Sequence, residues 1–358
     1  MSSTFHALRV AGVRREIDDA VSLELEVPPE LREAFRFTPG QHLTLRAEIG
    51  GEDVRRNYSV CAAPHEGELR VAIKRVAGGA FSGWANEVVR PGDTLEAMPP
   101  HGSFTWTFDA ANAHGYVGFA AGSGITPILS ILKAALTVEP RSAFTLLYGN
   151  RESNSVMFLE ELANLKNRFM ARLQVYHFLS AESEDVDLFN GRLDADKVAH
   201  VLRALVDPGA IDAAFVCGPG AMMDAAQAAL AEAGVARDRI LVERFTVGKL
   251  TEARRARAQA LTQAAEGRRV QVTLEGRRRV LAFDAAKGSI LDNARAAGLP
   301  APFACKSGVC STCRARVVSG EVEMKANYGL SAAEVAQGYV LTCQAVPLTD
   351  DVALDYDA

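Results

Sequence analysis

The feature that most constrains this chain is a group of four cysteines. Cys305, Cys310 and Cys313 follow the spacing Cys-x4-Cys-x2-Cys, and Cys343 comes after 29 intervening residues. The chain has 358 residues and six cysteines in all. Six are too few for a disulfide framework at this length, so the group indicates metal chemistry.

The cysteine spacing is the one by which four thiolates hold a [2Fe-2S] cluster of the plant-type ferredoxin kind. Gly308 keeps the loop small, together with Ser307 and Ser311, so that backbone N–H groups can point at the sulfurs. A structural zinc site is the alternative. Zinc motifs usually pair two short-spaced couples, however, and Cys305 and Cys343 each lack a close partner. We therefore predict that the cluster ligands are Cys305, Cys310, Cys313 and Cys343.

Composition sets the scale of the molecule and excludes some partners. With 48% hydrophobic residues, the chain can form two or three domains that each have a core. Its 39 Lys and Arg against 44 Asp and Glu, without long runs of one sign, predict no nucleic-acid partner. No segment approaches the ~18 uncharged apolar residues of a membrane span, and the N-terminus lacks a signal-peptide pattern. We expect a cytoplasmic protein with no membrane partner.

The texture of the chain changes near residue 108. Residues 1–108 contain short strands, such as 42–46 and 69–73, between Gly, Pro and Asp turns, which is typical of an antiparallel barrel or sandwich. In residues 109–247, apolar strands alternate with helical stretches. That alternation predicts an α/β domain, with a parallel sheet wrapped by helices.

The C-terminal part reads as a linker followed by a small domain. Residues 248–267 are rich in Ala, Arg and Gln without a wide apolar stripe, which predicts a linker with at most partial helix. In residues 268–358, two strands flank a Glu275-Gly276 turn as a hairpin, and Ser289 caps a helix. The cysteine loop follows, so we expect a small α+β domain.

Two loops of the α/β part are candidates for binding a nucleotide. The first, 121–127, lies between an apolar strand and an apolar helix, where free N–H groups can meet a pyrophosphate. A lone Gly-x-Gly is as often a tight structural turn. The second, 217–219, also joins a strand to a helix, so both can converge at the carboxyl edge of one sheet. The candidate residues are Gly122, Gly124, Thr126, Cys217, Gly218 and Pro219.

The first domain contains residue types that suit a flavin dinucleotide. Arg56 and the small residues around Gly79 can meet phosphate, Tyr58 can lie on the isoalloxazine ring, and Ser59 can bond its N5 edge. Taken singly, Tyr58 is more often a core residue of a strand, and a glycine pair is more often a turn.

Together and in this order, these motifs resemble the ferredoxin-NADP reductase family, followed by a plant-type ferredoxin module, over nearly the whole chain. The resemblance implies an FAD-binding β-barrel, an NADP-binding α/β domain and a β-grasp ferredoxin domain. Within the family, the segments 37–43, 148–151, 305–313 and 338–344 are similar to those of the subfamily of reductase subunits of bacterial phenylacetyl-CoA epoxidases, although other oxygenase reductases share these motifs.

The resemblance also implies roles for single residues. Arg56 would hold the FAD phosphate, Tyr58 and Ser59 would contact the flavin, and residues 79–82 would wrap the pyrophosphate. Cys217 would lie beside the nicotinamide, and with Ser59 it forms the catalytic pair. The further residues assigned to the cofactors are Lys74, Gly79, Phe81, Ser82, Gly122, Gly124, Thr126, Arg151, Gly218, Pro219 and Phe245, the last as a cover for the flavin.

The implied function is electron transfer from NADPH through FAD and the cluster to a diiron oxygenase that epoxidises phenylacetyl-CoA. The alternatives are a reductase of another oxygenase, hydroxylase or hybrid-cluster protein, and a non-enzymatic redox sensor. NADPH is favoured because the second α/β strand ends at Arg151, where a cation can meet a 2′-phosphate, although Glu152 is adjacent. Lys306, Arg314 and Arg316 predict a basic rim that an acidic or mixed patch of the acceptor would meet.

Overall fold

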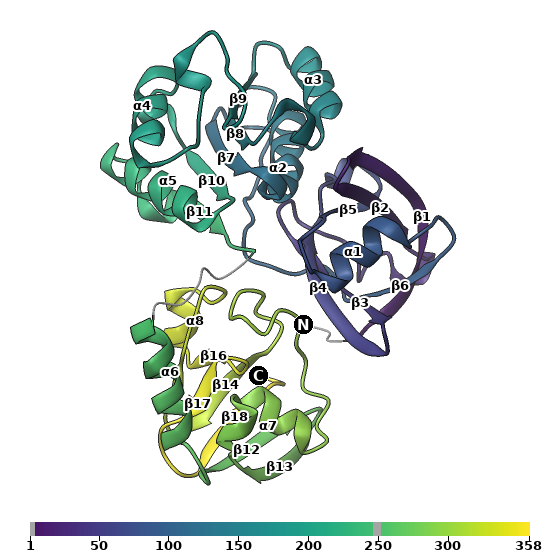
Figure 1. Cartoon of the computed structure of the whole chain (residues 1–358), viewed down its shortest axis with the longest axis vertical. Helices are drawn as coiled ribbons and strands as arrows, with labels where there is room; N and C mark the ends of the chain where they lie inside the picture. Colours follow the sequence, from purple (N-terminus) through teal and green to yellow (C-terminus); the bar gives the residue numbers. More distant parts are fainter. Residues whose placement is uncertain (1–3, 246–251) are drawn as a thin grey trace. The chain divides into compact units, whose positions relative to one another are not determined.

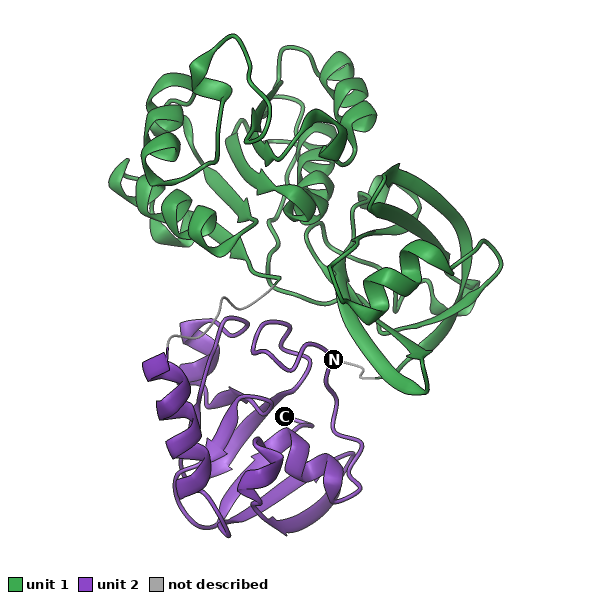
Figure 2. Cartoon of the chain, viewed as in Figure 1, with its two compact units in different colours: residues 1–245 green, residues 246–358 purple. Residues whose placement is uncertain are grey.

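A computed structural model describes residues 4–245 and 252–358, and its contacts divide the chain into two compact units (Figure 2). The first unit covers residues 1–245 and the second 246–358. The predicted domain end at 247 and the first residues of the predicted linker, 248–251, lie outside the described residues.

The first part of unit 1 is a barrel. Its six strands have the order β4-β3-β6-β1-β2-β5 and pair antiparallel. Val60, just after β4, bridges to Val71 in β5 and closes the barrel, which decides between the predicted barrel and sandwich. Helix α1 (Ala80–Glu87) packs Phe81 into the barrel core. The strands are β1 (His6–Ile17), β2 (Ala20–Glu26), β3 (His42–Ile49), β4 (Glu52–Ser59), β5 (Leu69–Lys74) and β6 (Thr94–Ala97).

The second part of unit 1 is the predicted parallel sheet, with strand order β11-β10-β7-β8-β9. Helices α2 (Ile125–Val138) and α3 (Leu159–Arg168) contribute to one core, and α4 (Ala195–Leu205) and α5 (Gly220–Glu232) to another, as expected for helices on the two faces of the sheet (Figure 1). The strands are β7 (Gly115–Ala121), β8 (Ala143–Asn150), β9 (Leu173–Leu179), β10 (Ala213–Cys217) and β11 (Ile240–Glu243).

The barrel and the parallel sheet share a hydrophobic core, so contacts group them as one unit where the sequence predicted two domains meeting at 108/109. Cys61 and Ala72 of the barrel belong to the same buried cluster as Ile125 and Ile128 of α2. Sequence texture records the change of architecture but not this shared core.

A set of charges also joins the two parts, and we call Arg70, Lys133, Glu66 and Glu161 the charge cluster; Arg70 and Lys133 are its buried members. Arg70 lies on β5, and its guanidinium donates to both carboxylate oxygens of Glu161 on α3, at 2.9 and 3.1 Å. Lys133 of α2 forms ion pairs with Glu161 and, at 3.0 Å, with Glu66 of the barrel. The Lys133 side chain is only 2% exposed. Although burial opposes ionisation, hydrogen bonds from Arg70 and the charge of Lys133 lower the pKa of Glu161 from 4.5 to about 2.

Replacing Glu161 by Gln should therefore destabilise unit 1 at neutral pH. A carboxylate whose pKa falls on folding stabilises the native state above its unfolded pKa, and this contribution disappears as the pH falls toward 2. We expect a loss of roughly 3 kcal/mol at pH 7 that shrinks between pH 5 and pH 2. Urea unfolding can be followed by tryptophan fluorescence, because both tryptophans, Trp84 and Trp106, lie in unit 1. Glu160→Gln, on the exposed side of the same helix turn, is the control. Equal unfolding midpoints for the two variants would contradict the prediction.

Unit 2 contains the predicted hairpin and helix. Its main sheet has the order β13-β12-β18-β14-β16, with a small second sheet of β15 and β17. The hairpin turn places Glu275 and Gly276 at φ 52° and 69°, and Ser289 accepts a hydrogen bond from the N–H of Asp292 as the predicted helix cap. The elements are β12 (Arg269–Leu274), β13 (Arg277–Ala282), α7 (Ile290–Ala296), β14 (Arg314–Ser319), β15 (Val322–Met324), α8 (Ala332–Ala336), β16 (Tyr339–Leu341), β17 (Ala345–Pro347) and β18 (Val352–Asp355).

Most of the predicted linker is a helix that belongs to unit 2. Helix α6 (Glu252–Ala264) packs Leu261 against the core of this unit and buries Thr262. Arg257 pairs with Glu323 at 2.9 Å. Helix α6 touches the core along a narrow strip around Leu261, so its sequence needs no wide apolar stripe.

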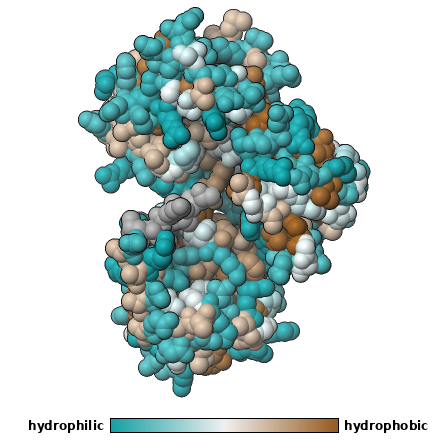
Figure 3. Space-filling model, in the orientation of Figure 1, coloured by the Kyte–Doolittle hydropathy of each residue, from teal (hydrophilic) through white to brown (hydrophobic). Residues whose placement is uncertain are grey.

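Apolar groups lie scattered among hydrophilic ones over much of the face in Figure 3, and none of the helices in the described ranges has the length and hydropathy to cross a membrane.

Candidate functional site

The four predicted cluster cysteines lie in one region of unit 2. Cys305, Cys310 and Cys313 belong to the loop before β14, and β14 pairs with β16, which carries Cys343 just beyond its end. Interaction with Cys310 lowers the pKa of the Cys305 thiol, and interaction with Cys313 lowers the pKa of the Cys343 thiol. The same interactions, together with burial, raise the pKa of the Cys310 and Cys313 thiols.

The cysteine loop presents N–H groups to sulfur, as the sequence predicted. The amides of Ser307 and Cys310 lie 3.3 and 3.4 Å from the Cys305 sulfur. Gly308 has φ 78°, and a Cβ there would lie 2.9 Å from Cγ of Gln344 and 3.0 Å from the carbonyl oxygen of Ala326. Backbone amides aimed at the Cys305 sulfur suit a thiolate that binds an anionic iron–sulfur cluster.

Hydrogen bonds not foreseen from the sequence hold the cysteine segments together. The Thr342 hydroxyl donates to the carbonyl of Cys313 at 2.9 Å, and the Tyr356 hydroxyl donates to the Thr342 oxygen at 2.7 Å. Thr342 is fully buried. This chain of bonds fixes the backbone of two predicted cluster ligands, Cys313 and Cys343, from the β18 side.

The predicted basic rim is locally neutralised. Lys306 forms an ion pair with Asp292 at 2.8 Å, and Arg314 forms one with Glu334 at 2.9 Å. The two carboxylates come from α7 and α8, which lie elsewhere in the sequence. Counting charges along the cysteine loop therefore overestimated its positive charge. The surface beside the cluster loop is mixed in charge.

The predicted flavin residues Arg56, Tyr58 and Ser59 lie on β4, which pairs with β3. Arg56 is exposed, whereas Ser59 is buried and pairs in register with His42 of β3. The ring of Tyr58 lies 5.5 Å from that of Phe81 on α1, centroid to centroid. Burial raises the pKa of the Tyr58 hydroxyl, which therefore stays protonated. Phe81 lies in the barrel core and supports the partly buried Tyr58 ring, which is of the kind a flavin ring packs on.

The predicted pyrophosphate loop is built around the start of α1. Gly79 precedes the helix without a side-chain cap, so the first N–H groups of α1 have no side-chain acceptor at that position. The Ser82 hydroxyl accepts from the amide of Val76 at 3.0 Å and thereby closes the loop. Lys74 ends β5 with its ammonium 3.6 Å from Asp19. This geometry fits a phosphate group at the helix start.

The structure brings the two predicted nucleotide loops together. In the parallel register, Cys217 of β10 pairs with Ala120 of β7. A Cβ on Gly124 would lie 2.1 Å from the carbonyl oxygen of Cys217, and one on Gly218 would lie 3.1 Å from Cβ of Ala121. The loops therefore touch backbone to backbone, which only glycine permits.

Other predicted residues complete the same edge of the sheet. The Thr126 hydroxyl donates to the carbonyl of Ser123 at 3.0 Å, the Tyr148 hydroxyl donates to that of Gly122 at 3.0 Å, and Pro219 caps α5. The Nδ2 atom of Asn150, at the end of β8, is buried without a hydrogen-bond partner. Such an orphaned donor beside an open glycine loop fits a nucleotide ligand.

The predicted specificity residue, Arg151, projects from the edge. Its side chain is 80% exposed and lies 3.9 Å from the Glu152 carboxylate, at the outer limit of an ion pair. The guanidinium is thus accessible to a phosphate group.

Two polar residues near the predicted sites, Glu243 and His42, were not predicted as site residues from the sequence. Glu243 ends β11 and pairs in parallel register with Cys217, and burial raises the pKa of its carboxyl group to about 8. Cys217 is fully buried, and burial and Glu243 raise the pKa of its thiol well above the usual value. His42, beside Ser59, has a buried Nε2 without a partner. Phe245, the predicted flavin cover, lies two residues beyond Glu243 and is 41% exposed.

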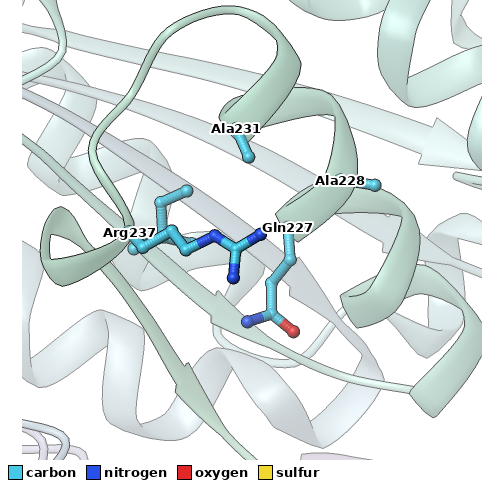
Figure 4. A pocket seen from close by; sticks show the side chains of 5 residues that line it. Gln227, Ala228, Ala231 and Arg237 are labelled. Carbon is cyan, nitrogen blue, oxygen red and sulfur yellow. The ribbon is translucent and has the colours of Figure 1, made fainter.

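A separate hollow of about 280 Å³ lies between α5 and the start of β11. Figure 4 shows Arg237 extending toward the part of α5 that carries Gln227 and Ala231. The nucleotide loops follow the carboxyl ends of the strands, whereas this hollow lies at the amino end of β11. It is therefore not part of the predicted nucleotide site.

Comparison with protein families finds three matching domains. Residues 9–106 match the oxidoreductase FAD-binding domain, residues 119–228 the oxidoreductase NAD-binding domain, and residues 272–348 the 2Fe-2S iron-sulfur cluster binding domain. These are the barrel, the parallel sheet and the cysteine-containing unit.

Full-length relatives and structures agree with this order. The chain is 46% identical over 356 residues to a component of the 1,2-phenylacetyl-CoA epoxidase of Escherichia coli K12, covering 99% of each chain. It is 35% identical to the ferredoxin reductase component of 3-ketosteroid-9-alpha-monooxygenase of Rhodococcus rhodochrous, covering 98% of this chain and 96% of that one. Phthalate dioxygenase reductase shares its fold, with a TM-score of 0.59 at 23% identity over 98% of each chain.

Proposed function

Because the chain belongs to the ferredoxin-NADP reductase family, in the branch with a C-terminal [2Fe-2S] domain, we propose that it carries electrons from NADPH to a diiron phenylacetyl-CoA epoxidase. The chain is an NAD(P)H-dependent flavin and iron–sulfur oxidoreductase of an oxygenase system. The single observation that supports this acceptor is the 46% identity over 99% of both chains to the epoxidase component. We place the activity in the cytoplasm, where thiols stay reduced.

The residues of this chain would bind the flavin and the nicotinamide and orient them toward each other. FAD held by the barrel would supply two-electron hydride chemistry, and a [2Fe-2S] cluster held by Cys305, Cys310, Cys313 and Cys343 would supply one-electron transfer. In this proposal Tyr58 packs on the flavin, Ser59 bonds its N5 edge, residues 79–82 wrap the pyrophosphate, and the loops at Gly124 and Cys217 present the nicotinamide. With a pKa of about 8, Glu243 holds a proton at neutral pH at the end of the strand beside Cys217.

Reconstitution with purified oxygenases tests the acceptor. The protein is mixed with NADPH, phenylacetyl-CoA and the diiron epoxidase component, and NADPH consumption is compared with epoxide formation. We expect coupled turnover with the epoxidase and only uncoupled oxidation with a Rieske dioxygenase. Preferential coupling to another oxygenase would overturn the proposed acceptor. Failure of NADPH to bleach the cluster would favour the redox sensor instead.

The preference for NADPH should depend on Arg151. An exposed guanidinium at the end of β8 can form charge-assisted hydrogen bonds with the 2′-phosphate, which NADH lacks. Arg151→Ala should lower kcat/KM for NADPH by about tenfold, equivalent to one hydrogen bond to a charged group, and leave kcat/KM for NADH within about twofold. Steady-state reduction of ferricyanide measures both. Equal loss with the two nucleotides would refute this role.

A further inference from the structure

Helix α2 physically connects the two predicted cofactor sites of unit 1. Its N-terminus follows the nucleotide loop at Gly124, and its middle bonds to the segment that continues the flavin strand beyond Ser59. The Ser130 hydroxyl donates to the carbonyl of Ala62 at 2.6 Å, and the Lys133 ammonium donates to that of Cys61 at 3.4 Å. In Figure 1, α2 is drawn between the parallel sheet and the barrel.

The charge of Lys133 strengthens this connection. Its ammonium lies 3.0 Å from Oε2 of Glu66, and the same oxygen accepts the amide of Ala63 at 2.7 Å. The Lys133 ammonium also pairs with Glu161, whose carboxylate accepts a hydrogen bond from Arg70 of the barrel. The 61–66 segment is thus bound to α2 through its backbone and through a carboxylate.

From this arrangement we infer that Lys133 is a positioning residue, which sets the approach of the nicotinamide to the flavin by locking the 61–66 segment to α2. The inference rests on the proposed placement of flavin at residues 56–59 and of nucleotide at residues 122–126. It adds to the proposed function a residue that contacts neither cofactor site directly and acts through the backbone that carries both.

The physical reason is the short range of hydride transfer. Reacting atoms must approach to about 3–3.5 Å, and a misplacement of about 1 Å can cost about 100-fold in rate. Apolar contacts between barrel and helix tolerate small sliding, whereas a buried ammonium with two carboxylates and a carbonyl accepts few arrangements. Burying such charges usually gains little stability over apolar packing, so a role in fixing one arrangement accounts for them better than stability does.

Lys133→Met tests the inference, because methionine fills similar space without the charge. The FAD-loaded full chain is mixed with saturating NADPH or its 4-deuterated form in a stopped-flow instrument without any oxygenase. We expect flavin reduction to slow about 10- to 100-fold, with a larger deuterium isotope effect and a weaker flavin–nicotinamide charge-transfer band. The dissociation constant for NADP⁺ should change less than about twofold, since the nucleotide loop is intact.

Matched variants separate positioning from loss of a charge or of the fold. Lys166→Met removes a lysine from α3 outside the charge cluster and should leave all these values unchanged. Glu66→Gln removes the charge that Lys133 meets on the 61–66 segment and keeps the lysine with its Glu161 pair, so it remains informative if Lys133→Met loses FAD. We expect it to slow flavin reduction about threefold to tenfold, in keeping with one hydrogen bond.

The outcomes distinguish this inference from the proposed function. A parent protein whose flavin NADPH does not reduce would overturn the proposed function. A parent that is reduced normally, with unchanged rates and isotope effects in Lys133→Met or, if that variant lacks FAD, in Glu66→Gln, would overturn only the positioning role. The identity of the acceptor affects neither result, because no oxygenase is present.

Discussion

Replacing Cys310 by Ser should remove the iron–sulfur absorbance and abolish turnover with the oxygenase, while FAD stays bound and NADPH still reduces it. Cys310 is buried in unit 2 and is one of the four predicted cluster ligands, so the replacement removes a thiolate that would bind iron. Among the described residues, those that form the hydrophobic core of unit 2 lie between Leu261 and Tyr356, so the flavin site in unit 1 should be unaffected.

The measurements are iron content, visible absorbance and reduction of two acceptors. Ferricyanide, which can accept electrons from the flavin, should be reduced at nearly the parental rate, whereas oxygenase-coupled turnover should fall to background. Cys61→Ala, which removes a free cysteine of unit 1, should keep its iron. Loss of flavin from Cys310→Ser would contradict the independence of the two units.

Replacing Gly124 by Ala should nearly abolish reduction by NADPH while leaving FAD and the cluster in place. The added Cβ would lie 2.1 Å from the carbonyl oxygen of Cys217 and 3.0 Å from the amide nitrogen of Gly218. Both are backbone atoms that cannot swing away, so the two nucleotide loops must separate. Because transfer rates depend steeply on placement, we expect kcat/KM for NADPH to fall about 100-fold or more.

Gly220→Ala is the matched control for this variant. Gly220 is the first residue of α5, two residues beyond Gly218, and a Cβ there meets only a side-chain nitrogen of Arg244 at 3.8 Å. NADPH should reduce the flavin of Gly220→Ala at nearly the parental rate. Dithionite should still reduce both the flavin and the cluster of Gly124→Ala. If NADPH reduced the flavin of Gly124→Ala at the parental rate, the close contact of the two loops would not be needed.

The sequence allowed prediction of the features that depend on local pattern. The Glu275-Gly276 turn, the Ser289 cap and the alternation of strands and helices after residue 109 all depend on neighbouring residues. The convergence of Gly124 with Cys217 could also be predicted, because the carboxyl ends of parallel strands meet at one edge.

Features that depend on distant partners could not be predicted in this way. Lys133 meets Glu66 across 67 positions of the chain, and its charge gives no local sign of that partner. The basic rim was overestimated for the same reason, because Asp292 and Glu334 neutralise its cations from other helices. Helix α6 was predicted as a linker because only a narrow line, around Leu261, touches the core.

The order of strands in unit 2 has a consequence for biosynthesis. Strand β18 (Val352–Asp355) lies at the centre of the main sheet, between β12 and β14, yet it follows all four cluster cysteines in the chain. The cysteines therefore leave the ribosome before β18, the strand that completes the sheet supporting the cysteine loop. Until residues 352–355 emerge, β12 and β14 lack the strand between them, and the Tyr356 bond to Thr342 cannot form. Insertion of iron and sulfide into a settled loop thus belongs after translation of this segment, and ribosome-stalled chains ending before it should not retain iron.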